Sequence, residues 1–242
     1  MRGNSREDAN TNDPSNTSNA AIDFSNATGD AHRARKVSLQ HRQGCYHCVT
    51  HVRPVLVDAV VLRCHPTNVA DAVRGVSSQA GFPEFGALAL TFVLRGDLAR
   101  LRIPSLTSPR RVDRLWEHTC FEAFVRAKGQ AGYYEFNFSP SGEWAVYAFR
   151  EYREGGPIDD DQLNPKIAVQ KEAETLELHA VIRLDRLSKI QPGSILRLGL
   201  SAVVEDINGR LSHWALKHPL GKPDFHHPDA FAMELAMPGL KA

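Results

Sequence analysis

The sequence predicts an all-β protein in which two antiparallel sheets pack as a β-sandwich of about 190 residues. From Val55 onward, short apolar runs are separated by Gly, Pro and Asp at the spacing typical of an all-β domain. No segment repeats at a fixed period, and only residues 69–78 and 184–189 favour a helix or a helical turn. Many short strands with few helices indicate one core, which at this size needs neither metal nor disulfides to be stable.

The strands themselves are predicted from apolar residues at every second position. Residues 86–103 are expected to form a hairpin that turns at Gly96 and Asp97. Its buried face is predicted to comprise Leu88, Leu90, Phe92 and Leu94. The other predicted strands, separated by turn residues, cover 121–127, 133–138, 143–150, 176–184, 195–205 and 231–235.

The first 52 residues have a different composition from the rest of the chain. They are rich in Asn, Ser, Thr, Asp and Arg, and their isolated apolar residues follow no helical or strand period. Such a segment buries too little apolar surface to offset its ordering entropy. We therefore predict a disordered polar tail over residues 1–52 and a β-sandwich domain over residues 53–242. The pair Cys45 and Cys48 stands alone in that tail and indicates no metal or redox site.

The overall composition argues against several classes of protein. Twenty-nine Lys and Arg face 28 Asp and Glu, which leaves no field that would attract nucleic acid or an anionic membrane. No run approaches the roughly 18 apolar residues of a membrane span, and no apolar core of a secretory signal opens the chain. Four unevenly placed cysteines agree with a reducing compartment. The sequence predicts a cytoplasmic protein with neither a nucleic-acid nor a membrane partner.

Trp116 and Glu122 are the first candidate functional residues. An even number of positions separates them, so both would point to the same face of an extended strand. An aromatic ring can cover the apolar face of a polyhydroxylated ligand while a neighbouring carboxylate accepts hydrogen bonds from its hydroxyls. This favours binding, although Trp116 could instead cap the edge of the core while Glu122 pairs with a neighbouring Arg.

A second candidate region covers residues 212–229, which are rich in His, Lys and Asp around Trp214. The polar side chains of this Pro-rich segment are difficult to explain by packing, so we expect a recognition loop. His218, Asp224 and His226 are also capable metal ligands, but no recognised zinc spacing is present and no cysteine is near in sequence. We therefore predict no metal and no cofactor, and keep haem or metal binding by this loop as the alternative.

A catalytic set is not predicted. Hydrolysis would need two carboxylates roughly 5–10 Å apart or a Ser/His/acid set. Glu117 and Glu122 have opposite parity along the predicted strand, and Ser139 and Ser141 lie in a turn without the context of a nucleophile elbow. The sequence therefore predicts a protein that is not an enzyme.

Three segments resemble the bacterial DOMON-like proteins: 115–124 (LWEHTCFEAF), 133–144 (YYEFNFSPSGEW) and 218–226 (HPLGKPDFH). That group is similar to the family 9 carbohydrate-binding modules of xylanases. The resemblance extends over about residues 55–240 and implies an immunoglobulin-like or jelly-roll β-sandwich. In the family 9 modules, a sugar lies between two tryptophans, and a Glu follows the first Trp by six residues.

Trp116 and Glu122 match that spacing, and Trp214 is the counterpart of the second ring. We therefore expect a non-catalytic module that binds a saccharide or sugar derivative. Trp116 and Trp214 would stack on the ligand, and Glu122 would accept its hydroxyl hydrogen bonds. The predicted rim of the site comprises His218, Lys222, Asp224 and His226. A module that docks a protein partner is the remaining alternative.

Overall fold

The computed structural model describes residues 55–56 and 58–239. The predicted tail, its boundary at residue 52 and the Cys45/Cys48 pair lie outside these residues. The described elements are strands with a few short 3-10 helices (η). In chain order they are β1 Val55–Leu56, β2 Val60–Cys64, β3 Val73–Glu84, β4 Ala87–Gly96, η1 Leu98–Arg100, η2 Leu115–Glu117, β5 Cys120–Ala127, β6 Tyr133–Phe138, β7 Trp144–Glu151, β8 Glu154–Pro157, η3 Asp161–Leu163, β9 Lys166–Lys171, β10 Thr175–Arg183, η4 Leu184–Arg186, β11 Ile195–Glu205, β12 Leu211–Ala215, η5 Pro228–Ala230 and β13 Met233–Ala236.

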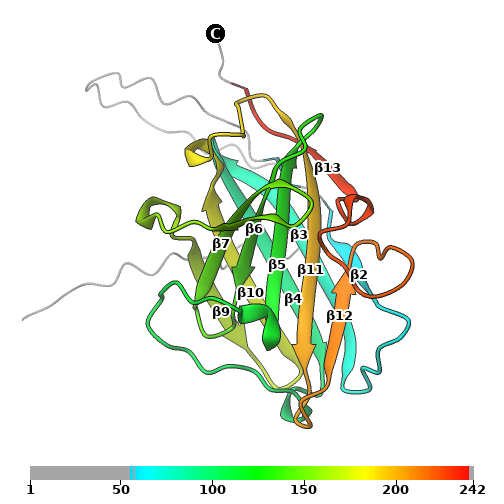
Figure 1. The fold of residues 1–242 in the computed structure, drawn as a ribbon. Helices are drawn as coiled ribbons and strands as arrows, with labels where there is room; N and C mark the ends of the chain where they lie inside the picture. The colour runs from blue at the N-terminus through cyan, green and yellow to red at the C-terminus, as the bar shows by residue number, and fades with distance from the viewer. Residues whose placement is uncertain (1–54, 57, 240–242) are drawn as a thin grey trace, which may run out of the picture. The chain divides into compact units, whose positions relative to one another are not determined.

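The strands of the described residues confirm the all-β, antiparallel prediction, but they do not form two separate sheets. They follow one hydrogen-bonded path in the order β8-β7-β6-β5-β11-β12-β2-β3-β4-β10-β9, with β1 added on β3 and β13 on β11. Figure 1 shows β5, β6, β7 and β11 in one layer across β3, β4, β10 and β9 in another. The two layers are continuous because β12 pairs with β2 through Trp214 with Cys64 and Ala215 with Arg63.

The core lies between these layers and follows the predicted alternation. On β4, Leu88, Leu90, Phe92 and Leu94 are fully buried, as the sequence predicts. Phe92 stacks on Phe121 of β5, with the two ring centroids 5.1 Å apart, so the two layers meet through aromatic side chains. Burying side chains of this size contributes roughly 1.5–3 kcal/mol each, which makes this interface the main source of stability.

Two segments differ from their predicted conformation. Residues 73–78 belong to β3 rather than to a helix, since β3 pairs with β2 on one side and β4 on the other. Pairing on both sides supplies backbone hydrogen bonds that a helix would otherwise provide, and Val and Ser at these positions suit a strand. Residues 211–215 form strand β12, whereas the sequence indicated only a loop there. The predicted turn near Leu184 is η4.

The layer that contains β5, β6, β7 and β11 is buried on both faces. Every residue of β6 is buried, although alternate side chains point in opposite directions. The outer face is covered by η2 and by the chain between β12 and β13, from which Phe225 and Phe231 pack against Phe124 and its neighbours. This second apolar cluster surrounds the candidate site. No helix of the described residues has the length and hydrophobicity needed to cross a bilayer.

Candidate functional site

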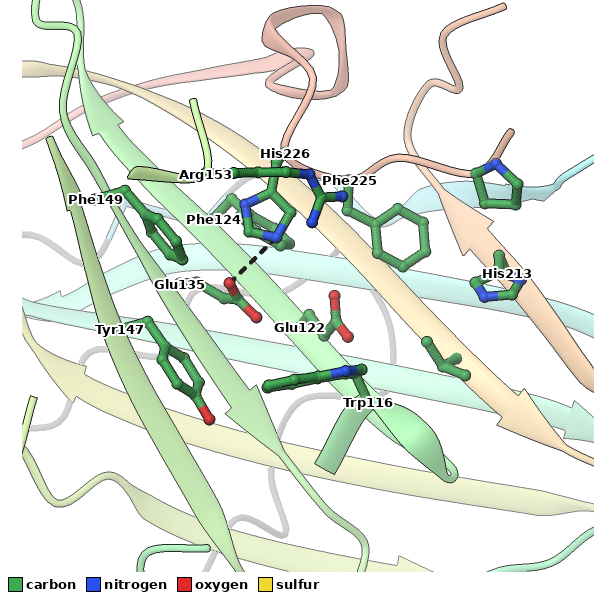
Figure 2. Close-up of a pocket in the computed structure, with 12 residues that line it drawn as sticks. Trp116, Glu122, Phe124, Glu135, Tyr147, Phe149, Arg153, His213, Phe225 and His226 are labelled. Atoms are coloured by element: carbon green, nitrogen blue, oxygen red, sulfur yellow. Dashed lines mark ion pairs between the residues drawn. The ribbon is translucent and has the colours of Figure 1, made fainter. Parts of the chain in front are cut away.

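A cavity of about 350 Å³ opens on the outer face of the β5–β6–β7–β11–β12 layer. Figure 2 shows two carboxyl groups in its centre, with Trp116 on one side and His226 and Arg153 on the other. Side chains from five strands and three connecting segments surround it. They are Trp116, Glu122, Phe124, Glu135, Tyr147, Phe149, Arg153, Val203, His213, Pro223, Phe225 and His226.

The two carboxyl groups belong to Glu122 of β5 and Glu135 of β6, whose exposed fractions are 2% and 5%. The register pairs Glu122 with Asn137 and Phe124 with Glu135, so the acids lie diagonally across neighbouring strands on one face. Sequence reasoning compared Glu122 with Glu117, of opposite parity, and therefore missed that Glu122 and Glu135 enter the same cavity.

Neither carboxyl group is fully satisfied by the protein. Ser201 Oγ donates to Glu122 Oε2 over 3.3 Å. Asn137 Nδ2 donates to Glu135 Oε1 over 2.8 Å. Burial, reinforced by the negative charge of Glu135, raises the pKa of Glu122 well above its usual range, against the hydrogen bond from Ser201. Burial also raises the pKa of Glu135 to about 7, opposed by Asn137 and Arg153. Two buried acids that share one cavity cannot both ionise easily.

His226 is held as a neutral ring above the acids. Burial, together with the positive charge of Arg153 and against the charge of Asp224, lowers the pKa of His226 to about 4. Tyr133 Oη lies 2.9 Å from Nδ1 of His226 and accepts the backbone N–H of Arg153. We therefore infer that the tyrosine hydroxyl donates to Nδ1, which leaves the proton on Nε2. That nitrogen lies 3.5 Å from Glu135 Oε2, so it points toward the carboxyl group.

Arg153 reaches the cavity from the tight turn between β7 and β8. Its backbone has φ 56°, a left-handed conformation that is uncommon for a residue with a side chain. Arg153 Nη2 donates to Asp224 Oδ1 over 2.8 Å, and the hydroxyl of Tyr152 donates to Asp224 Oδ2 over 2.6 Å. Burial disfavours ionisation of Asp224, but the hydrogen bonds from Tyr152 and Arg153 outweigh it and lower the pKa. The guanidinium is thus already paired.

Trp116 lies on η2 rather than on the predicted strand, although its ring still lines the same cavity as Glu122. Arg114, with φ 65°, precedes the short helix, and its guanidinium pairs with Glu117. The indole packs edge-on against Tyr147 at 5.6 Å between ring centroids and remains 38% exposed. Its outer part is therefore available to a ligand.

Only some of the predicted site residues line the cavity. Trp116, Glu122 and His226 line the cavity, and Asp224 orients Arg153 beside it. Lys222 is exposed and is not among the lining residues. His218 turns away, since its Nε2 lies 2.8 Å from the carbonyl oxygen of Arg63.

Trp214 does not lie in the cavity, which is a correction to its predicted stacking role. Its side chain packs in the core between the layers, with an exposed fraction of 7%, and its Nε1 donates to Ser212 Oγ. The neighbouring residue on β12, His213, faces the cavity instead. The side chain of Trp214 therefore points to the opposite face of the layer, because successive strand residues alternate.

The residues that sequence reasoning missed are Glu135, Tyr147, Phe149 and Arg153. Glu135 and Tyr147 are partners in the β6–β7 register. Alternation of side chains along β6 and β7 would therefore have identified both residues, but only if the pairing of these strands had been known. No local signal marks Arg153, because it lies in a turn and reaches the cavity only through the β7–β8 hairpin.

Within the described residues, no group of three or more His, Cys, Asp or Glu side chains is arranged to hold a metal ion. Met233 and Met237 are buried with the core cluster, as the sequence indicated for Met233.

No protein-family model matches the chain, and no curated protein matches it in sequence. Among solved structures, it is similar to a candidate carbohydrate-binding protein from Bacteroides uniformis, with 18% identity, a TM-score of 0.55, and coverage of 74% of this chain and 86% of that one. What the two share is the fold.

A weaker similarity connects the chain to a family 9 carbohydrate-binding module from Caldicellulosiruptor kristjanssonii, at 13% identity. The complex with cellotriose has a TM-score of 0.46 and covers 76% of this chain and 84% of that one. The complex with glucose has a TM-score of 0.43 and covers 72% and 81%. At these values the second similarity carries no argument about the site.

Proposed function

We propose that this protein is a non-catalytic binding module whose cavity holds a saccharide or sugar derivative. The observation that carries the proposal is the arrangement of Trp116, Glu122 and Glu135: a partly exposed indole beside two buried carboxyl groups in one cavity. A sugar ring needs an apolar surface for its C–H groups and oxygen acceptors for its hydroxyls, and this cavity offers both.

The size and lining of the cavity agree with a small ligand. Its volume of about 350 Å³ lies near the lower end of the roughly 300–1,000 Å³ of small-molecule pockets. Phe149 and Phe225 add apolar walls, and the polar groups converge from several strands, as specific orientation of a ligand requires. A single sugar or the end of a short oligosaccharide therefore fits better than a long polymer. The fold shared with a candidate carbohydrate-binding protein agrees with this proposal.

Membership of the DOMON-like group and a cytoplasmic location are further parts of the proposal, and both rest on the sequence. The division into a tail over residues 1–52 and a binding domain over residues 53–242 has the same basis. Neither the haem or metal alternative nor the protein-docking alternative has a comparable arrangement of side chains among the described residues.

The test is calorimetric titration of the full chain with monosaccharides and short oligosaccharides, repeated with Trp116→Ala. We expect the variant to keep its melting temperature and to lose at least about tenfold in affinity, because a stacked aromatic ring is a typical binding hot spot. Leu106→Ala is the matched control, since Leu106 is also exposed but does not line the cavity. Unchanged affinity in folded Trp116→Ala would contradict the proposal.

A further inference from the structure

The charges around the cavity do not balance, and this bears on which sugar it holds. Two carboxyl groups, Glu122 and Glu135, line it. Three lining residues could carry positive charge: Arg153, His213 and His226. Each of the three is either paired or kept neutral by its surroundings.

Arg153 forms an ion pair with Asp224, with 2.8 Å between Nη2 and Oδ1. Asp224 does not line the cavity, so an acid outside the cavity already balances part of the charge of Arg153. Burial lowers the pKa of His226 to about 4, which makes the ring neutral at pH 7. Burial also lowers the pKa of His213, and the nearby rings of His65 and His218 act in the same direction. The cavity therefore has two acids without a free cationic partner.

Glu122 also has an acceptor atom that the protein leaves unused. Its Oε2 accepts from Ser201, whereas its Oε1 has no hydrogen-bond partner among the described residues. The side chain is 2% exposed, and Figure 2 shows its carboxyl group directed into the cavity beside that of Glu135. A carboxylate oxygen that faces a cavity and has no donor from the protein can accept a hydrogen bond from a ligand.

We infer that the ligand is an amino sugar whose protonated amine lies between Glu122 and Glu135 while its ring packs against Trp116. This inference rests on the proposed function and adds the chemical class of the sugar. An ammonium group has three donors and a positive charge, so it can donate to the free oxygen of Glu122 while its charge attracts both carboxyl groups. Aromatic faces such as those of Trp116 and Tyr147 add further attraction for a cation.

Binding of a protonated amine should also change the number of protons bound by Glu122 and Glu135. When no cation lies beside the acid pair, burial and mutual repulsion favour a proton on it. An ammonium group takes the place of that proton, because it stabilises the ionised form of both carboxyl groups. Binding of an amino sugar should therefore release a proton, whereas binding of a neutral sugar should not. The titratable groups near the pair are Cys120, Tyr133, Tyr147, Arg153, His213 and His226.

The experiment is titration calorimetry of the full chain at pH 7 with glucose, glucosamine and N-acetylglucosamine, in two buffers of different ionisation enthalpy. The three sugars differ only at C2, and acetylation keeps the nitrogen but removes its charge. We expect glucosamine to bind at least about tenfold more tightly than the other two, since charge-assisted hydrogen bonds are the stronger class. We also expect only glucosamine to show a buffer-dependent heat, which measures proton release.

Glu122→Gln keeps the shape of the side chain and removes its charge. In this variant the affinity ratio of glucosamine to glucose should fall to within about threefold, because the remaining acid alone attracts the amine. Glu174→Gln is the matched control: it makes the same change at an exposed acid between β9 and β10 that is paired with Arg74, and it should leave the ratio unchanged. The melting temperature of each variant reports on folding, and proton release by the unaltered chain does not depend on any variant.

The outcomes separate the two proposals. Equal affinity for glucose and glucosamine without proton release would overturn the amino-sugar inference and leave the saccharide-binding proposal standing. A preference for glucosamine that persists in folded Glu122→Gln would overturn the role of this acid. Binding of ethanolamine as tightly as glucosamine, or the absence of binding by every sugar, would overturn the saccharide proposal itself.

Discussion

Glu122 and Glu135 are buried acids whose surroundings disfavour their ionised forms. Placing two carboxyl groups in one cavity is costly unless they are paired, and here the hydrogen bonds from Ser201 and Asn137 offset only part of that cost. Burial of this kind does not stabilise a fold. Perturbed acids in a cavity are typical of functional sites, which agrees with the assignment of the ligand site to this pair.

The raised pKa of Glu135 predicts a pH dependence of stability. The folded protein binds a proton at Glu135 that the unfolded chain releases from about pH 4.5, so this residue makes the free energy of unfolding fall as pH rises from about 4.5 to about 7. His226 acts oppositely between about pH 4 and 6.5, because the unfolded chain binds a proton there that the folded protein excludes. Glu135→Gln removes the first effect and also weakens the upward shift in the pKa of Glu122, which acts in the same direction. Relative to the unaltered protein, the variant should gain stability from pH 4.5 to 7, by on the order of 2–3 kcal/mol.

Urea unfolding of both proteins across pH 4 to 8 checks this prediction. Glu174→Gln serves as the control, since the hydrogen bond from Arg74 lowers the pKa of Glu174. Relative to the unaltered protein, this variant should lose stability as pH rises, which is the opposite sign. A constant difference between Glu135→Gln and the unaltered protein over the whole range would be evidence that the acid is not perturbed.

At the scale of elements, the β7–β8 hairpin is what brings Arg153 to the cavity. The register pairs Glu151 with Glu154, so Tyr152 and Arg153 form a two-residue turn. The left-handed backbone of Arg153 is held there by the hydrogen bond from its N–H to Tyr133 Oη. Next to the turn, Gly155 lies so close to β7 that an added Cβ would be 2.0 Å from the carbonyl oxygen of Ala148.

Gly155→Ala should therefore disturb the hairpin and, with it, the position of Arg153. We expect a loss of about 1–3 kcal/mol in the free energy of unfolding, as for other overpacked positions, together with weaker sugar binding. Gly156→Ala is a close control, because no atom lies within 4 Å of its added Cβ. It should change stability by no more than about 0.5 kcal/mol. Equal effects of the two substitutions, by thermal unfolding and calorimetry, would argue against this role of the hairpin.

At the scale of the whole described fold, strand β12 connects the two layers. It joins β11 in one layer to β2 in the other, and the backbone hydrogen bond from His65 N to the carbonyl of His213 extends this connection. Trp214 fills the core at the same place. Its two neighbours along β12, His213 and Ala215, face the outer side of the layer, so a single strand contributes to the core and to the site.

Trp214→Ala should therefore reduce stability rather than sugar recognition. Removing a buried Trp leaves a cavity, and we expect the free energy of unfolding to fall by about 3–5 kcal/mol. Trp116→Ala provides the contrast, since it should lower affinity with little loss of stability. Chemical unfolding and calorimetry on both variants separate the roles. If folded Trp214→Ala lost sugar binding without a loss of stability, the indole would belong to the site and not to the core.

The sequence by itself determined the strands with clear alternation and the face that each one buries. Leu88, Leu90, Phe92 and Leu94 are an example, because the period of two is a local property of the chain. It also selected Trp116 and Glu122, whose side chains line one cavity although Trp116 lies on a 3-10 helix. Parity accounts for the strand faces, whereas Trp116 reaches the cavity from a 3-10 helix, which the parity argument did not foresee.

The tertiary structure alone decided which strands are neighbours and which faces are covered. Glu135 meets Glu122 only through the β5–β6 register, and Arg153 arrives through a hairpin turn with no sequence signal. The expected stacking role of Trp214 was wrong because it came from the resemblance and from a predicted loop, whereas residues 211–215 form strand β12 and the indole packs in the core. Strand order and the covering of the outer face depend on contacts between residues far apart in the chain, and these contacts bury the two acids enough to raise their pKa values.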